Sequence, residues 1–150
     1  IRTYKSSDKS ACLNIFDSNV PGYFVESERQ EFEEWLDKAD RAPYYVLEVH
    51  ETIIACGGIY EDKEEKNAGL AWGMVHGSQH KQGLGKLITL HRLEVMNNLF
   101  PNHDQHLQTS QHTEGFYRKL GFITTELIKD GFGPGMDNYK MKKDSDTNAS

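Results

Sequence analysis

Apolar and polar positions alternate along residues 68–76, which predicts a buried β-strand. One predicted face carries three large apolar side chains, those of Leu70, Trp72 and Met74. A different spacing follows, since apolar residues recur every three or four positions over residues 84–99. This period predicts an amphipathic helix that ends before Pro101.

The same two periods predict further strands and helices along the rest of the chain. Ser27 and Gln30 form a capping-box signature for a second helix, whose apolar stripe includes Phe32, Trp35 and Leu36. The expected strands span residues 1–4, 44–49, 52–60, 68–76, 106–110, 122–129 and 138–142, and the other expected helices span residues 8–17, 84–99 and 113–120. This order predicts an α/β (α+β) fold with a mixed sheet.

A glycine-rich turn joins the strand at 68–76 to the helix at 84–99. Its residues are His80, Lys81, Gln82, Gly83, Leu84, Gly85 and Lys86. N–H groups at a helix start carry a partial positive charge, and glycine lets the backbone approach an anion, so the turn favours a phosphate ligand. A dinucleotide fingerprint would need glycine where Ile88 stands. A Walker A loop would need glycine at position 80 and Ser or Thr at position 87, so both motifs are excluded.

A second motif lies about thirty residues after the turn. It reads Phe116-Tyr117-Arg118-Lys119-Leu120-Gly121-Phe122. The turn resembles the acyl-coenzyme A loop of the GNAT N-acetyltransferase superfamily, Gln/Arg-x-x-Gly-x-Gly/Ala, with His80 in place of Gln or Arg. The second motif resembles that family's late FYxKLGF segment, and residues 16–24 resemble a bacterial branch with unassigned substrates.

The resemblance covers residues 1–143 and implies the GNAT fold. That fold has a mixed central sheet of about seven strands, flanked by about four helices, with its fourth and fifth strands splayed. The pantetheine arm of the co-substrate lies in the gap between these two strands. Residues 144–150 are expected to be a polar C-terminal tail.

The resemblance also implies acetyl-coenzyme A (acetyl-CoA) as co-substrate. All seven residues of the turn, from His80 to Lys86, are expected at its pyrophosphate. Met74 and Val75 are expected to pair with the pantetheine amides through their backbone, and their N–H groups to polarise the thioester. Ser110 stands where the family usually has Asn, so a shorter hydrogen-bonding contact is expected there.

Tyr117 is the residue expected to act as a general acid. In the reaction that the resemblance implies, an amine attacks the thioester directly and the departing thiolate needs a proton. A phenol is protonated at neutral pH and can donate to a thiolate whose conjugate acid has a pKa of about 8.5. The candidates for a general base are Asp17, Glu26, Glu61, His76 and a chain of water molecules. The acceptor is expected between two irregular segments, residues 18–26 and 130–137.

Composition and net charge limit the classes of binding partner that we expect. The 150-residue chain has a net charge of −6 and no basic stripe, which argues against nucleic acid and is compatible with an amine acceptor on a small molecule or a peptide. It has no long apolar run and no signal peptide, so no membrane contact and a cytoplasmic location are expected. A homodimer is compatible with the resemblance. The alternative function is an acyl-CoA-binding sensor or structural module without turnover.

Neither a disulfide nor a metal site is expected. Cys12 and Cys56 lack a Cys-x-x-Cys spacing, which is typical of buried reduced thiols. His103 and His106 are three apart on a predicted strand and would face opposite sides of it.

Overall fold

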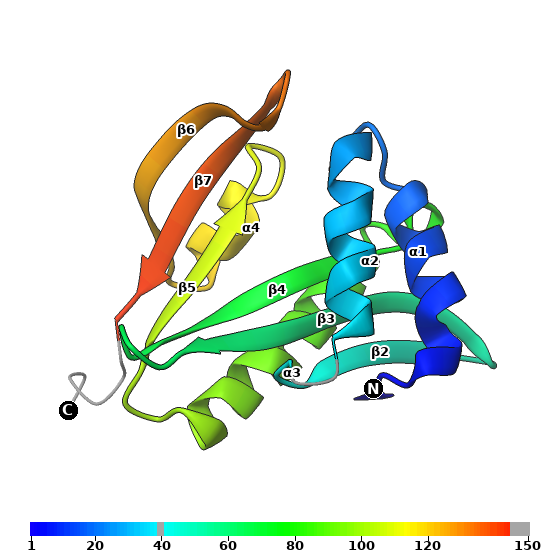
Figure 1. The fold of residues 1–150 in the computed structure, drawn as a ribbon, viewed down its shortest axis with the longest axis horizontal. Helices are drawn as coiled ribbons and strands as arrows, with labels where there is room; N and C mark the ends of the chain where they lie inside the picture. Colours follow the sequence, from blue (N-terminus) through cyan, green and yellow to red (C-terminus); the bar gives the residue numbers. More distant parts are fainter. Residues whose placement is uncertain (39–40, 145–150) are drawn as a thin grey trace.

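The computed structural model describes residues 1–38 and 41–144, which form one central sheet with helices on both faces (Figure 1). The strands are β1 (Arg2–Thr3), β2 (Tyr44–Val49), β3 (Thr52–Asp62), β4 (Asn67–Val75), β5 (Asp104–Thr109), β6 (Ile123–Gly133) and β7 (Met136–Lys143). The helices are α1 (Lys9–Asp17), α2 (Arg29–Asp37), α3 (Leu84–Leu99) and α4 (Glu114–Lys119), with short 3-10 helices η1 (Ser6–Asp8), η2 (Glu26–Glu28) and η3 (Gly77–Gln79). All but the first residue of the expected polar tail lies outside the described residues.

The seven strands form a mixed sheet in the order β1-β2-β3-β4-β5-β7-β6. Among the strands of the described residues, only β4 and β5 pair in parallel. These two strands pair over three residues each, from Asn67 opposite Asp104 to Gly69 opposite His106, and then diverge (Figure 1). The predicted α/β fold with splayed fourth and fifth strands is therefore confirmed.

Different helices cover the two faces of the sheet, because each helix presents one apolar side to it. α1 and α2 pack together on one face, where Phe16, Phe32 and Tyr44 are fully buried. α3 crosses the other face and buries Ile88 and Met96. Burial of such side chains is the main favourable term in folding. Strand β4 is consequently held from both sides.

A β-bulge in β4 corrects the predicted alternation of faces. Trp72 and Gly73 together oppose a single residue of β3, and Trp72 has a φ of 49°. The extra residue moves the following side chains to the other face. Leu70 therefore packs on the α3 side, whereas Met74 packs with α1 and α2, and the prediction that they share a face is wrong.

The start of the second helix also differs from the prediction. The capping interaction is formed by Glu28, whose carboxylate accepts a hydrogen bond from the Val25 N–H at 3.0 Å. Ser27 and Gln30 do not make the predicted capping box, because the chain enters the helix through η2, two residues earlier.

Most of the expected irregular loop at residues 130–137 belongs to the β6–β7 hairpin. Gly133 and Gly135 have φ values of 150° and 79°, which permit the tight turn between the two strands. The segment is therefore a hairpin rather than a loop, although the pairing of β6 with β7 is irregular between Ile128 and Gly133, as an irregular segment would be. No helix in the described part of the chain is long and apolar enough to span a membrane.

The two cysteines are free and fully buried, between α1 and β3, as predicted. A hydrogen bond with Cys56, together with burial, raises the pKa of the Cys12 thiol well above its ordinary value. Within residues 1–38 and 41–144, no three His, Cys, Asp or Glu side chains form a group that could hold a metal ion.

Candidate active site

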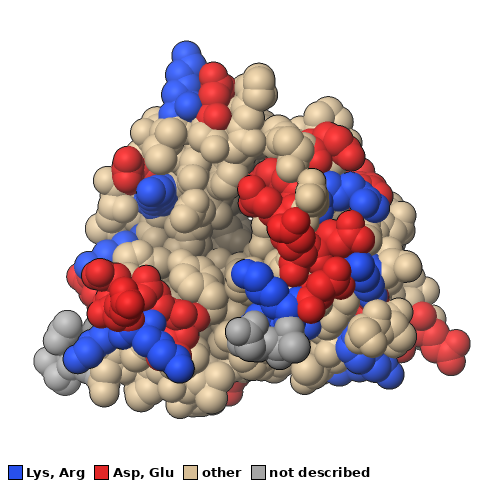
Figure 2. Space-filling view, in the orientation of Figure 1, with Lys and Arg blue, Asp and Glu red and all other residues tan. Residues whose placement is uncertain are grey.

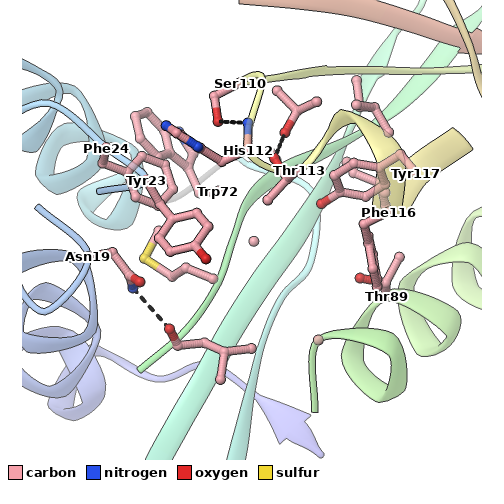
Figure 3. Close-up of a pocket in the computed structure, with 18 of the residues that line it drawn as sticks. Asn19, Tyr23, Phe24, Trp72, Thr89, Ser110, His112, Thr113, Phe116 and Tyr117 are labelled. Carbon is pink, nitrogen blue, oxygen red and sulfur yellow. Dashed lines mark hydrogen bonds between the residues drawn. The ribbon is translucent and has the colours of Figure 1, made fainter. Parts of the chain in front are cut away.

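A cleft of about 1060 Å³ opens where β4 and β5 diverge. It is lined by β4 from Leu70 to Val75, by the start of α3, by the end of β5 and by α4. The loop before α2 contributes Asn19, Tyr23 and Phe24 on the other side (Figure 3). The cleft brings together the predicted general acid and all the predicted co-substrate-binding residues except Gln82. In Figure 2 it is visible as a central hollow beside acidic side chains that gather over α2.

The glycine-rich turn lies at the cleft where α3 begins. Gly83 is the N-cap residue of α3 and has a φ of 78°, a conformation that suits glycine. It provides no side-chain cap, so the first N–H groups of the helix can serve an anion. A Cβ built on Gly83 would meet nothing within 4 Å, and one on Gly85 would meet only Val75. The open backbone and the nearby Lys81 can therefore hold a phosphate.

His80 turns back onto the end of β4. Its Nε2 donates a hydrogen bond to the Val75 carbonyl at 2.9 Å, and the same carbonyl accepts one from Asn19 Nδ2 at 2.9 Å. The His80 ring also contacts Tyr23 edge-to-face, with centroids 4.9 Å apart. These contacts tie the turn to the loop before α2, while the expected phosphate contact of His80 stays a prediction.

Tyr117 projects into the cleft from α4, and its hydroxyl points into the cavity (Figure 3). Its ring packs edge-on against Phe116 and Phe122, with centroids 5.0 and 6.2 Å away. Such packing fixes a phenol ring and leaves its polar end free to donate. The residue is therefore suited to deliver a proton inside the cleft.

Ser110 was predicted as the last residue of the strand, but β5 ends one position earlier, at Thr109. It is buried, and its Oγ accepts a hydrogen bond from the His112 N–H at 3.2 Å (Figure 3). Ser110 thus organises the loop that leads into α4. A contact between Ser110 and the co-substrate stays a prediction.

None of the four side chains considered as general bases lines the cleft. Asp17 pairs with Arg29 and Glu61 pairs with His103. His76 accepts a hydrogen bond from the Ser78 N–H, and Glu26 is exposed to solvent. The expectation that these side chains lie in the cleft is therefore wrong, because the direction of a surface side chain depends on the surrounding fold, which residue type does not reveal.

Two carboxylates and an imidazole that the sequence did not single out line the cleft instead, those of Glu28, Glu31 and His112. Burial raises the pKa of Glu28, although its hydrogen bond from the backbone opposes this change. His112 lies near Tyr23, with ring centroids 5.8 Å apart. Imidazole can accept a proton near neutral pH. The spacing of Glu28 and Glu31, three apart at a helix start, is a signal that could have indicated a shared face.

Comparisons with known proteins agree with this geometry. Residues 40–124, more than half of the chain, match the family model described as acetyltransferase (GNAT) domain. No curated protein matches the chain.

Solved structures share the fold over nearly the whole chain. A GNAT-family protein from Desulfovibrio desulfuricans is 17% identical with a TM-score of 0.79, over 96% of this chain and 97% of that one. The ribosomal-protein-alanine N-acetyltransferase from Brucella melitensis is 17% identical with a TM-score of 0.76, over 95% and 97%. The ribosomal-protein-S18-alanine N-acetyltransferase from Escherichia coli is 15% identical with a TM-score of 0.77, over 95% and 91%.

Proposed function

The chain belongs to the GNAT family of acetyltransferases, and on that premise we propose that it moves the acetyl group of acetyl-CoA to a primary amine on a small molecule or a peptide. The amine attacks the thioester directly while both substrates are bound. One observation carries the proposal: a single cleft joins the glycine turn of α3, the bulged strand β4 and Tyr117. Residues 1–143 are the catalytic domain in this proposal, and the cytoplasm is its compartment.

Acetyl-CoA lies along the β4 side of the cleft in this proposal. The N–H groups at the start of α3 and the positive charges of Lys81 and Lys86 favour the pyrophosphate at the turn. Beyond Gly69, β4 has no β5 partner, so its β5-facing backbone groups can pair with the pantetheine amides around Met74 and Val75. The Val75 carbonyl already accepts hydrogen bonds from Asn19 and His80, so Val75 would contribute through its N–H. Both ends of the co-substrate are thereby accounted for.

The proposed reaction needs two proton transfers. The amine loses a proton, its nitrogen forms a bond to the acetyl carbon, and the carbon–sulfur bond breaks with its electron pair going to sulfur. Tyr117 supplies the proton to that sulfur. His112 lies in the same cleft, and its imidazole can accept the one proton that the nitrogen of the neutral amine loses on attack. These assignments give each proton a side chain of suitable chemistry.

We expect acetyl-CoA to raise the melting temperature of the protein, whereas NAD and ATP do not. The glycine turn lacks residues that the dinucleotide and Walker A motifs need to bind those nucleotides. A ligand at a hundredfold excess over its Kd stabilises the protein by about 2.7 kcal/mol. Differential scanning fluorimetry with the three ligands at matched concentrations measures this. Equal shifts for all three would contradict the assignment, and release of CoA thiol with an amine present separates an enzyme from a binding module.

The acidic side of the cleft supports a cationic acceptor. Glu28 and Glu31 line the cleft from the start of α2, and acidic side chains gather beside the hollow in Figure 2. Together with the net charge of −6, they attract an ammonium group. Polyamines, amino acids, amino sugars and peptides are therefore the acceptor classes to screen.

With the best acceptor from that screen, we expect Glu31→Gln to raise the KM for the amine severalfold and to leave the KM for acetyl-CoA unchanged. Removing one negative charge weakens attraction to a cation without altering the glycine turn. Glu26→Gln is the control, because this carboxylate lies just before α2 but outside the cleft. If both variants changed the KM for the amine equally, the acceptor would bind elsewhere.

A further inference from the structure

The largest fully buried side chain of the described residues is an arginine. Arg92 lies on α3, is 1% exposed and lines the cleft. Its Nη1 donates to the Gly58 carbonyl at 3.2 Å and its Nη2 donates to Thr89 Oγ1 at 3.3 Å, while its Nε has no partner. Neither acceptor is a carboxylate. The guanidinium is therefore a buried positive charge with two long, neutral hydrogen bonds.

Such a group is costly to keep for stability alone. An arginine stays charged at every physiological pH, and transfer of that charge out of water is compensated only by close anionic partners or several good hydrogen bonds. Arg92 uses two of its five N–H donors, each at long range. A neutral side chain of similar length would fill the same space without the desolvation cost. The folded state alone thus gives no reason for a charge here.

Two glycines hold the charge against the bulge of β4. A Cβ built on Gly73 would lie 2.4 Å from Arg92 Nη2, and a Cβ built on Gly57 would lie 2.8 Å from Arg92 Cζ. Either side chain would force the guanidinium to move. The absence of side chains at both positions therefore lets the guanidinium lie directly against the backbone of β3 and β4.

The other face of the bulge is fixed by Tyr44, whose hydroxyl donates to the Trp72 carbonyl at 2.7 Å. In a planar trans peptide, the N–H lies opposite the carbonyl, so the Gly73 N–H points away from Tyr44. Tyr44 belongs to the α1–α2 side and Arg92 comes from the α3 side. The peptide between Trp72 and Gly73 is consequently held in place by Tyr44. The positive charge of Arg92 lies beside this peptide, and neither of its hydrogen-bond acceptors is a carboxylate.

We propose that Arg92 is a positioning residue for acetyl transfer, whose charge stabilises the negative charge that develops on the thioester oxygen during attack by the amine. This inference rests on the proposed function, in which the thioester lies along β4 at the bulge. The guanidinium of Arg92 lies against the backbone of Gly73, and the side chain also lines the cleft. It acts through the bulge, where a fixed charge in a medium of low dielectric interacts more strongly than it would in water.

Arg92→Met separates this role from a structural one. It removes the charge and keeps the length of the side chain, so we expect an equal or higher melting temperature, an unchanged KM for acetyl-CoA and a kcat at least tenfold lower. Arg92→Lys retains a charge with fewer donors and should recover part of the loss. A lower melting temperature with wild-type kcat per folded molecule would overturn the proposal.

A second variant moves the charge without removing it. Gly57→Ala adds a Cβ that the guanidinium must avoid, at a position without positive φ, so kcat should fall severalfold while the fold is kept. The infrared stretch of acetyl-CoA labelled with ¹³C at the carbonyl gives a readout without turnover. A positive field polarises that bond, so the bound frequency should be lower in the wild type than in Arg92→Met.

These measurements distinguish the two possible failures. If the wild type neither binds acetyl-CoA nor releases CoA with any amine, the proposed function fails. If the wild type does both, while Arg92→Met keeps its kcat and carbonyl frequency, the inference about Arg92 fails alone. A wild-type preference for succinyl-CoA that Arg92→Met abolishes would make the guanidinium a direct ligand of an acyl carboxylate, and would also overturn the positioning role.

Discussion

Tyr117→Phe is expected to lower kcat by about a hundredfold with little change in the KM for acetyl-CoA, because it removes only the hydroxyl that points into the cleft. The ring keeps its packing against Phe116 and Phe122, so the fold should be unaffected. Steady-state kinetics with the best acceptor and a melting curve measure the two effects separately. Tyr139→Phe is the matched control, since Tyr139 packs against the same hydrophobic cluster outside the cleft.

The effect of Tyr117→Phe should also depend on pH. A general acid is needed at a pH below the pKa of the CoA thiol, about 8.5, where the departing thiolate takes up a proton. Above that pH the thiolate can leave without a proton. The defect should therefore shrink as the pH rises past that value. A defect of constant size across the pH range would mean that the hydroxyl positions the thioester, and unchanged kcat would assign Tyr117 to packing alone.

Gly83→Val and Gly85→Val should each abolish acetyl-CoA binding in a folded protein. A β-branched side chain at either position would stand where the anion approaches the first turn of α3. At Gly83 the substitution also imposes strain of about 1–3 kcal/mol, because its φ is 78°. Isothermal titration calorimetry with acetyl-CoA measures the loss of binding.

Gly135→Val provides a closely matched control for that strain. Gly135 has a φ of 79° and, like Gly83, open space around its Cβ position, but it lies in the β6–β7 turn outside the cleft. Gly135→Val should lose a similar amount of stability but bind acetyl-CoA with wild-type affinity. Retained affinity in folded Gly83→Val would mean that the co-substrate binds elsewhere.

The elements that carry the glycine turn could be predicted because their local signals agree. The helix at 84–99 was predicted with its observed bounds, since its period is regular and Pro101 follows it closely. The strand at 44–49 was likewise correct, because apolar residues dominate it and turn residues bound it. Both elements are specified by residues close in sequence.

Features that depend on distant parts of the chain could not be predicted in this way. The bulge at Trp72 arises from pairing with β3, so the apolar alternation gave the wrong face for the residues after it. Arg92 reads as an ordinary polar residue of a helix, and only the fold shows that Gly57 and Gly73 make room for it. The cleft position of His112 depends in the same way on the loop after β5. These features of the site could therefore not be predicted from the residues adjacent to them in the sequence.

The short pairing of β4 with β5 has a mechanical consequence. It divides the molecule into two half-sheets, β1–β4 and β5–β7, joined by only three opposed residue pairs and by side chains such as Leu70 and Leu107. A ligand that pairs with the free edge of β4 and fills the gap works as an eighth strand. In each catalytic cycle the joint between the two half-sheets would then become more rigid when acetyl-CoA binds and more flexible when CoA leaves. The co-substrate would therefore also serve as a temporary part of the sheet.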